Sequence, residues 1–480
     1  MKARRAWDAG RPSSLISNWR SNSTPIDADI RHEIEAIRTR CRDAAQNNDH
    51  ARQFVRLVET NVVGSSGFSV QSRAPLASGR PDRLAIDAIE EAWHRQSERG
   101  QWDVSGTMTR AQFDRLVLRT MAIDGECLIR ITTGWPRSDS AFAVQIIDAA
   151  TLDETYNADL PGGGSIRMGI EMDEYRRPIA YHLTKAPSAV SRTYKVRERV
   201  RVPASEIIHL YLPEWIWQSR GIPWMAASLV RMQMLGGYED AAITAARSAA
   251  IKSAAYVQSP DVPPGTGPAG DEDEITGALN QVLEPGLAEI LPYGWDLKSL
   301  DWSWPNVEHG EFTKGCLRGI AAGLGVSYNM LATDLEGVNY SSLRQGALAE
   351  RDLWMTLQDW YISAAVRPIF ERWLMYSVGL GRITRPSGRP LDPARADSLR
   401  RATILGRRWP WVDPVKDLQA AELAIKLRTR SISDVIREQG RDPDDVWAEL
   451  AADQERLRDM GLMTDTDTDT DTGAIPDVED

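Results

Sequence analysis

Cysteine and histidine are scarce in this 480-residue sequence, and their scarcity argues against two classes of protein. The three cysteines, Cys41, Cys127 and Cys316, are odd in number and widely spaced, so they do not indicate the disulfide framework of a small secreted domain. The six histidines never cluster with cysteines at the spacing of zinc ligands. We therefore expect no metal site and interpret the cysteines as small buried hydrophobic residues.

The sequence also lacks the motifs of nucleotide-dependent and hydrolytic enzymes. It contains no GxxxxGK[ST] phosphate loop, and Gly319, Gly323 and Gly325 lack the spacing of a dinucleotide-binding fingerprint. The run from Gly64 to Gly67, GSSG, is not a GxSxG nucleophile elbow. We expect no cofactor and no catalytic residue, so the sequence predicts a protein that is not an enzyme.

Carboxylates are plentiful, and they leave one enzymatic alternative open. Asp148, Asp153, Glu171 and Asp173 lie at the ends of predicted strands, where they could hold the metal ions of a nuclease of a phage or mobile element. Aspartate is favoured in turns for conformational reasons, so solvated turn residues are the favoured interpretation. The Thr-Asp repeat near the C-terminus has Thr472 where a calcium loop needs glycine, and it predicts a weakly ion-condensing tail.

Long apolar runs and a strongly basic composition are absent as well. The most apolar helical stretch, Ala241 to Val257, is interrupted by Arg247 and Lys252 and does not predict a membrane span. The N-terminus has the positive start of a signal peptide without its apolar core, so we expect no export and folding in the cytoplasm. The formal net charge of −11 gives no overall basic surface for gripping nucleic acid.

The patterns that are present predict an α+β chain of several units, because 480 residues exceed a single hydrophobic core. Residues 1–26 have no periodicity and predict a mobile arm. Apolar residues at helical spacing follow to about residue 123, and short runs rich in β-branched residues continue to residue 213. Within those runs we interpret SIRMGIEMD and PIAYHLT as the two arms of one hairpin.

The second half of the chain is mostly helical by the same criteria. An alanine-rich helix is predicted from Trp224 to about Tyr256, followed by a Pro/Gly-rich insertion over residues 258–305. Three amphipathic helices are expected near the C-terminus, at Asp417 to Leu427, Ser431 to Gln439 and Asp442 to Met460. The acidic, low-complexity residues 462–480 predict a disordered tail.

Two helical segments around an acidic loop form the most informative stretch. The first runs from Val307 to Leu324, and the second from Ser341 to Val378 with a kink at Pro368. Between them LATDLEGVN carries two acidic residues and no basic one. The residues themselves leave three roles open: an active-site lid, a ligand clamp, or a surface past which a negatively charged molecule must move without sticking.

Seven segments together resemble the lambda-type phage portal proteins. They are TRCRDAAQNNDHARQFVRLVETNVVGSSG (39–67), DGECLIRI (124–131), QIIDAATLD (145–153), GIEMDEYRRPIAYHL (169–183), RVPASEIIHLYLPEWIWQSRGIPWMAASL (201–229), RGIAAGLGVSYNMLATDLEGVNYSSLR (318–344) and WPWVDPVKD (409–417). Their order and spacing agree over nearly the whole chain. The first 30 residues and the Thr-Asp tail lie outside the resemblance.

The resemblance implies a portal-type fold in which several regions surround a DNA channel. The implied regions are a wing (27–222), two stem helices (223–257 and 306–325), a small β-containing clip (258–305), a tunnel-loop region (326–340), a long wing helix (341–379) and a helical crown (380–461). The wing would combine helices with the β-rich block. The flexible arm and the acidic tail would lie at the two ends.

The resemblance also implies a site and a set of partners. The residues of the DNA-channel tunnel loop would be Thr333, Asp334, Leu335, Glu336, Gly337, Val338 and Asn339, and an acidic loop suits a channel because it does not grip phosphate. The implied partners are other copies in a twelve-subunit ring, double-stranded DNA, the terminase large subunit, the major capsid or scaffold protein, and a head-completion or adaptor protein. The implied locations are the portal vertex of the virion and the host cytoplasm during assembly, with no membrane.

Overall fold

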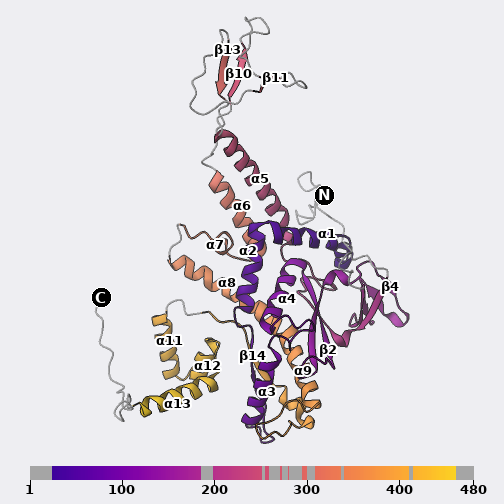
Figure 1. Ribbon diagram of the computed structural model, residues 1–480, viewed down its shortest axis with the longest axis vertical. Helices are drawn as coiled ribbons and strands as arrows, with labels where there is room; N and C mark the ends of the chain where they lie inside the picture. The colour runs from indigo at the N-terminus through magenta and orange to yellow at the C-terminus, as the bar shows by residue number, and fades with distance from the viewer. Residues whose placement is uncertain are drawn as a thin grey trace, which may run out of the picture. The chain divides into compact units, whose positions relative to one another are not determined.

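The computed structural model (Figure 1) describes residues 24–184, 198–250, 254–258, 271–272, 279–280, 295–299, 309–336, 340–409 and 414–460. The chain divides into two compact units, one made of Met1–Ala226 and Asp334–Asp480 and the other of Ala227–Thr333. All the paired strands among the described residues run antiparallel, and helices lie between the groups of strands along the chain. The predicted α+β class is confirmed.

The first helices of the larger unit lie where the apolar periodicity predicts them. They are α1 (Ile26–Asn47), α2 (Asp49–Val58) with its π-helical continuation η3 (Glu59–Val63), α3 (Arg83–Gln96) and α4 (Arg110–Asp124). The Asn48 side chain accepts a hydrogen bond from the Ala51 N–H group and so caps α2, while Thr109 and Gln112 form a capping box on α4. Gly125, at φ 81°, ends α4.

The predicted β-rich block forms two sheets. In the three-stranded sheet β2 (Glu126–Thr133) lies between β3 (Phe142–Ile147) and β9 (Ile207–Tyr211). The five-stranded sheet runs in the order β4 (Ala158–Asp159), β5 (Ser165–Arg167), β6 (Ile170–Met172), β7 (Pro178–Thr184) and β8 (Arg199–Pro203). A further pair joins β1 (Ser69–Ser72) to β14 (Ala402–Leu405), which are more than 300 residues apart.

The predicted single hairpin needs a correction. SIRMGIEMD is not one strand: it holds both β5 and β6, which reverse direction at Met168 and Gly169, at φ 48° and 81°. Two successive residues with positive φ make a tight hairpin turn, and glycine adopts that conformation easily. The pairing of β6 with β7 is as predicted, so the segment contributes one extra strand.

The long helix of the larger unit continues through proline as a π-helical turn. It consists of α8 (Tyr340–Tyr361), η7 (Ile362–Val366) and α9 (Arg367–Gly379). Pro368 has no N–H group to donate, and its ring crowds the preceding turn, so the irregularity there is expected. The predicted kink is thus found as the π-helical turn just before Pro368.

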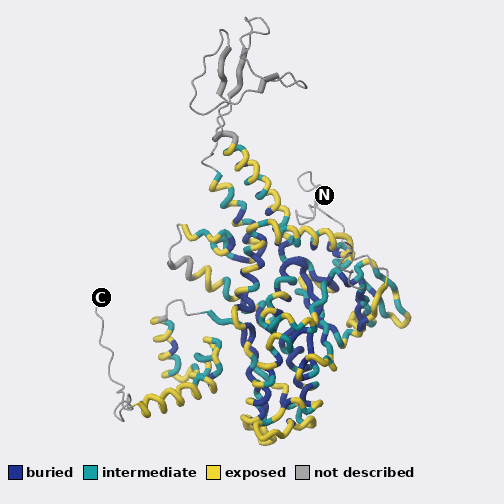
Figure 2. Tube along the Cα trace, viewed as in Figure 1, coloured by how far each residue is buried: buried dark blue, intermediate teal, exposed yellow. Residues whose placement is uncertain are grey.

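Aromatic side chains join α9 to the N-terminal helices. The Trp93 ring centroid lies 4.9 Å from that of Trp373, 5.1 Å from that of Phe370 and 5.5 Å from that of Trp102. The Tyr361 hydroxyl donates a hydrogen bond of 2.8 Å to buried Asp114 on α4. Figure 2 shows that α2, α4 and α9 are rich in buried residues. The aromatic contacts and the Tyr361–Asp114 hydrogen bond belong to the core of this unit.

Three helices near the C-terminus confirm the amphipathic pattern to within a few residues. They are α11 (Pro414–Lys426), α12 (Ile432–Glu438) and α13 (Pro443–Asp459), and they follow the short elements η8 (Pro393–Arg395) and α10 (Ala396–Leu399). Ser431 forms a capping box with Asp434, and Asp442 accepts a hydrogen bond from the Asp444 N–H group. The predicted arm up to residue 23 and the predicted acidic tail lie outside the described residues.

Glu90 on α3 gives a testable dependence of stability on pH. Burial raises the pKa of Glu90 from its usual value of 4.5 to about 7. The hydrogen bond from the Ser72 N–H group lowers this pKa, and the negative charges of Asp442, Asp445 and Asp87 raise it further. Between pH 4.5 and about pH 7 the Glu90 carboxyl is ionised in the unfolded chain but protonated in the folded chain. Stability is therefore lost as the pH rises through about 7.

We expect Glu90→Gln to raise the melting temperature at pH 8 and to leave it nearly unchanged at pH 4. The amide oxygen can still accept from the Ser72 N–H group, so only the ionisation penalty is removed. Thermal unfolding followed by circular dichroism measures the difference. Glu91→Gln, at an exposed position on the same helix, is the control. An equal shift for Glu90→Gln at both pH values would contradict the assignment.

The smaller unit has two long helices and short strands. Its described elements are α5 (Ala226–Ala250), β10 (Ala254–Gln258), β11 (Asp271–Glu272), β12 (Leu279–Asn280), β13 (Trp295–Ser299), α6 (His309–Leu324) and α7 (Tyr328–Ala332). The prediction that the alanine-rich helix reaches Tyr256 was wrong, since residues 254–258 pair with β13. Cross-strand pairing there outweighs the helix propensity of alanine. α7 was not predicted.

Small residues let α5 and α6 approach closely. The Ser228 hydroxyl on α5 donates to the Ile320 carbonyl oxygen of α6 at 3.1 Å, and a Cβ atom on Gly323 would lie only 2.2 Å from the Ser228 oxygen. Near the other end of this contact the rings of Tyr238 and His309 stack at 5.3 Å. None of the helices in the described ranges is long and apolar enough to cross a membrane.

Candidate functional site

The predicted tunnel loop is described only in its first half. Thr333 to Glu336 belong to the described residues, whereas Gly337, Val338 and Asn339 lie outside them. Thr333 follows α7 at φ 53°, an unusual conformation for a β-branched residue. The Asp334 carboxylate accepts a hydrogen bond of 2.9 Å from the Glu336 N–H group, which forms a compact turn.

The charged groups in the described half of the loop are carboxylates, which accept hydrogen bonds. Asp334 and Glu336 carry carboxylates, Leu335 is 64% exposed, and Thr333 donates its hydroxyl to the neighbouring Ala332 carbonyl oxygen at 2.7 Å. None of these four side chains is basic. A surface of this kind repels phosphate rather than binding it. The assignment of the loop to a DNA channel stays a prediction.

Each of the four carboxylates of the nuclease alternative forms hydrogen bonds or ion pairs with its own set of partners. Their partners are Arg42 for Asp148, Arg199 and Thr155 for Asp153, Arg201 and His182 for Glu171, and the N–H groups of Tyr175 and Arg177 for Asp173. In the part of the chain that the structure describes, no three His, Cys, Asp or Glu residues are grouped to hold a metal ion. These carboxylates fix strands and turns, and the nuclease alternative is not supported.

A buried charge cluster that was not predicted lies at the start of β2. The Glu126 carboxylate is completely buried and accepts hydrogen bonds from Arg38 at 2.8 Å, Arg220 at 2.6 Å, His209 at 3.0 Å and the Gly221 N–H group at 2.9 Å. These donors come from α1, from β9 and from the segment before α5. One carboxylate therefore joins three distant parts of the larger unit to β2.

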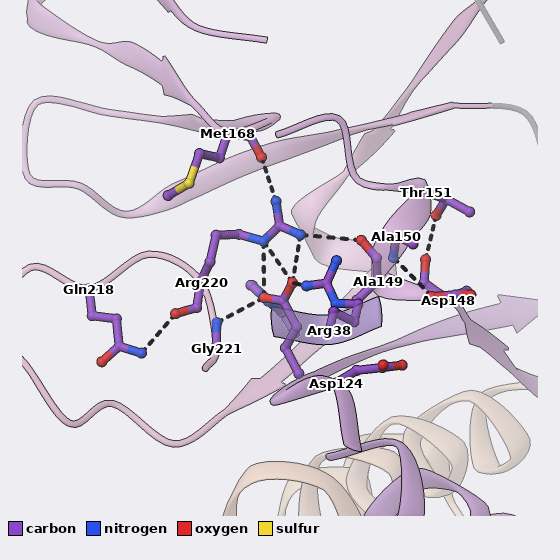
Figure 3. Close-up of polar contacts among 12 residues, drawn as sticks. Arg38, Asp124, Asp148, Ala149, Ala150, Thr151, Met168, Gln218, Arg220 and Gly221 are labelled. Carbon is purple, nitrogen blue, oxygen red and sulfur yellow. Dashed lines mark hydrogen bonds and ion pairs between the residues drawn. The ribbon is translucent and has the colours of Figure 1, made fainter. Parts of the chain in front are cut away.

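Arg220 extends the cluster to the backbone of two further segments. Figure 3 shows its guanidinium between the carbonyl oxygens of Met168 and Ala149, to which it donates at 3.0 and 3.2 Å. Beside it Arg42 binds Asp124 and Asp148, each at 2.7 Å. Buried charges are stable only when they are paired and hydrogen-bonded in this way.

The pKa of Glu126 reflects this surrounding charge. Burial alone raises the pKa of Glu126, but the charge of Arg220, the hydrogen bond from His209 and the charge of Arg38 together hold it well below its usual value. The carboxylate is therefore ionised at neutral pH. It acts as a fixed counter-charge for the two arginines and not as a proton donor.

Two glycines let the cluster close. A Cβ atom on Gly221 would lie 2.1 Å from the Gly125 carbonyl oxygen, and one on Gly125 would lie 2.1 Å from the Ile222 carbonyl carbon. The runs DGE and RGIP in the sequence therefore meet backbone to backbone. The only signal in the sequence is that each run places a charged residue beside a glycine among apolar residues.

The sequence profile described as "Phage portal protein, lambda family" matches residues 13–358. The chain belongs to this family. A curated relative described as "Probable portal protein" of Halomonas phage phiHAP-1 is 36% identical over 463 residues, which cover 95% of this chain and 88% of the relative. Portal protein B of Escherichia phage lambda is 23% identical over 476 residues, 93% of this chain and 88% of that protein. The resemblance carried by the seven sequence segments is confirmed.

Among solved structures, the fold is similar to a chain titled "Neck of empty GTA particle computed with C6 symmetry". The identity is 14%, the TM-score is 0.41, and the match covers 89% of this chain and 98% of the other. Membership of the portal family rests on the sequence matches: the family match ends within α8, and the two relatives cover 95% and 93% of the chain.

Proposed function

We propose that this portal-family protein forms a ring at one vertex of a phage capsid and serves there as a conduit for DNA during packaging and ejection. The observation that carries the proposal is the family match over residues 13–358, together with the relatives that it aligns with nearly end to end. The role is mechanical and not enzymatic. The energy for packaging would come from a partner, the terminase.

Within this proposal the smaller unit supplies the stem and the clip. α5 and α6 are the two stem helices, and the clip over residues 258–305 contains the short strands β11, β12 and β13, while β10 ends where the clip begins. α5 exposes Val230 and Met234, which are 68% and 71% accessible. Apolar side chains exposed along one helix favour contact with another surface, and a neighbouring copy in a closed ring supplies one. We propose a ring of twelve copies.

The larger unit supplies the wing and the crown. The helices and sheets over residues 27–222 and the long helix over 341–379 make the wing, and residues 380–461 make the crown. The loop from Thr333 to Asn339 would meet DNA in the channel, where its acidic residues keep the phosphates from sticking. The clip would dock the terminase large subunit. A head-completion or adaptor protein and the major capsid or scaffold protein complete the set of partners.

Electron microscopy of the purified full-length chain tests the proposal. We expect ring-shaped particles with twelvefold symmetry, and their absence at every salt and protein concentration would overturn it. Incubation with supercoiled plasmid and magnesium or manganese tests the nuclease alternative, and we expect no cleavage. Cleavage that Asp148→Ala or Asp173→Ala abolished would restore that alternative.

A further inference from the structure

A pocket whose described lining residues include no carboxylate lies in the larger unit, beside the end of η3. It has a volume of about 370 Å³. Its lining residues are Thr60, Gly64, Ser65, Ser66, Gly67, Ser69, Leu405, Gly406, Arg407, Arg408, Gln439 and Gly440. They include two arginines and four hydroxyl side chains. In a chain with a formal net charge of −11, a pocket with these donors and no acid is a local exception.

Arginines gather around this pocket without acidic partners. Arg407 and Arg408 line it, and Arg351 on α8 lies close by, since the guanidinium carbons of Arg351 and Arg407 are 5.9 and 5.6 Å from the centroid of the Trp409 ring. In the described part of the chain, none of the three forms an ion pair with a carboxylate. Trp409 thus brings together two positive charges, those of Arg351 and Arg407.

The positive charge of Arg407 is destabilised by its surroundings, so a bound anion would stabilise it. Burial lowers the pKa of Arg407, and the like charge of Arg351 lowers it further. The Arg408 Nε atom is buried and has no hydrogen-bond partner among the described residues. An anion in the pocket would offset the repulsion between the guanidinium groups.

The pocket is held rigidly by the end of η3. The last carbonyl groups of a helix lack partners within it, and here side chains supply them. The buried Gln358 amide donates to the carbonyl oxygens of Asn61, Val62 and Arg407, each at 3.1 Å, and the Arg407 Nη1 group donates to the Thr60 carbonyl oxygen and, at 3.1 Å, to the Asn61 side chain. This holds Arg407 in place before any ligand arrives, which lowers the entropy lost on binding.

The turn from Gly64 to Gly67 supplies the remaining donors. Gly64 and Gly67 have φ of 73° and 76°, and the exposed Ser65 and Ser66 lie between them. Both serines line the pocket and bring hydroxyl donors to it, whereas the Gly64 N–H group donates to the Glu59 carbonyl oxygen at 3.2 Å. The Gly64 carbonyl oxygen is turned to Arg115, which donates to it at 3.2 Å.

We propose that this pocket binds a phosphate group of the DNA backbone. Planar guanidinium groups and serine hydroxyls are the donors that phosphate oxygens prefer, and the pocket contains both. The inference rests on the proposed function, because it takes DNA as the source of the phosphate. One such contact per subunit gives a weak hold that salt screens, so DNA can still slide past the ring.

Fluorescence anisotropy with a labelled DNA duplex tests the pocket in the full-length protein across a range of salt concentrations. We expect the double variant Arg407→Gln, Arg408→Gln to bind about tenfold more weakly and the slope of log K against log salt to fall by about 1 per lost contact. The control Arg137→Gln, Arg389→Gln removes the same charge from exposed positions outside the pocket. Equal losses in both variants would overturn the proposal.

Ser66→Glu tests the pocket without removing the arginines that pack against η3. The exposed Ser66 lines the pocket, so a carboxylate there should repel phosphate and weaken duplex binding, while the control Ser78→Glu at an exposed turn should not. Thermal unfolding checks that both variants are folded. Unchanged duplex binding by Ser66→Glu would overturn the proposal even if the arginine variant failed to fold.

Two further measurements distinguish DNA from free phosphate as the ligand, and failure of the pocket proposal from failure of the proposed portal function. If inorganic phosphate at constant ionic strength binds the wild-type protein and not Ser66→Glu, while duplex binding is the same for both, the pocket takes free phosphate and the DNA assignment is wrong. Electron microscopy of the same samples shows whether rings form. Rings with unaltered duplex binding in the pocket variants would contradict this inference alone, whereas a loss of rings in the wild type would contradict the proposed function.

Discussion

Replacing Glu126 with glutamine is expected to lower the free energy of unfolding by about 3–5 kcal/mol, because removing one partner of a buried ion pair leaves the other charge uncompensated. Arg220 is completely buried and Arg38 is 3% exposed, so neither guanidinium can turn to water. Glutamine has nearly the size of glutamate, so the change removes charge and little packing. Urea or thermal unfolding followed by circular dichroism measures the effect.

The matched control is Glu174→Gln, at an exposed position in the turn before β7. Its effect should stay within about 0.5 kcal/mol of wild type, as for most surface substitutions. If Glu126→Gln unfolded as the control does, the cluster would not be a stabilising element. Arg220→Met, which removes the other charge, should also destabilise, since Glu126 would then lose its nearest partner.

The pH dependence of the same variant follows from the direction of the pKa shift. The pKa of Glu126 lies lower in the folded chain than its unfolded value of 4.5, so its contribution is present above that pH and is lost as the pH falls through the folded value. The difference between wild type and Glu126→Gln should therefore shrink as the pH falls below 4.5.

Deleting Leu335 to Val338 is expected to spare ring assembly and to abolish the packaging or retention of DNA. Leu335 and Glu336 are exposed, and the turn that holds them is local, so their removal should leave α7 and α8 intact. The loss of function follows if the loop is the part of the channel that meets DNA. Electron microscopy of the rings and the amount of nuclease-protected DNA in assembled particles measure the two effects separately.

A same-length replacement of Leu335 to Val338 by glycine and serine is the control for loop length. It keeps the reach of the loop and removes the side chains of Leu335, Glu336 and Val338, while Asp334 stays. If only the deletion fails, length matters and side chains do not. If the deletion prevents the subunit from folding, the loop is a structural joint between its helices and the channel assignment is wrong.

Local signals in the sequence determined most of the secondary structure of this protein. The helices α1, α2 and α4 and the three C-terminal helices were predictable because apolar periodicity and caps such as Thr109 and Ser431 act within a few residues of chain. The seven family segments likewise sufficed to identify a lambda-type portal protein, and this was confirmed over residues 13–358. The sequence also marked Thr333 to Asn339 as an acidic loop.

Tertiary structure alone decided the features that depend on distant pairing. Residues 254–258 became a strand because they pair with residues 295–299, although their alanines favour helix locally. The Glu126 cluster needs Arg38, His209 and Arg220, each more than 80 positions away. The pocket lined by Arg407 and Arg408 likewise joins η3 to the segment after β14. Burial in a packed core sets such partners, and no local periodicity encodes which distant charges will meet.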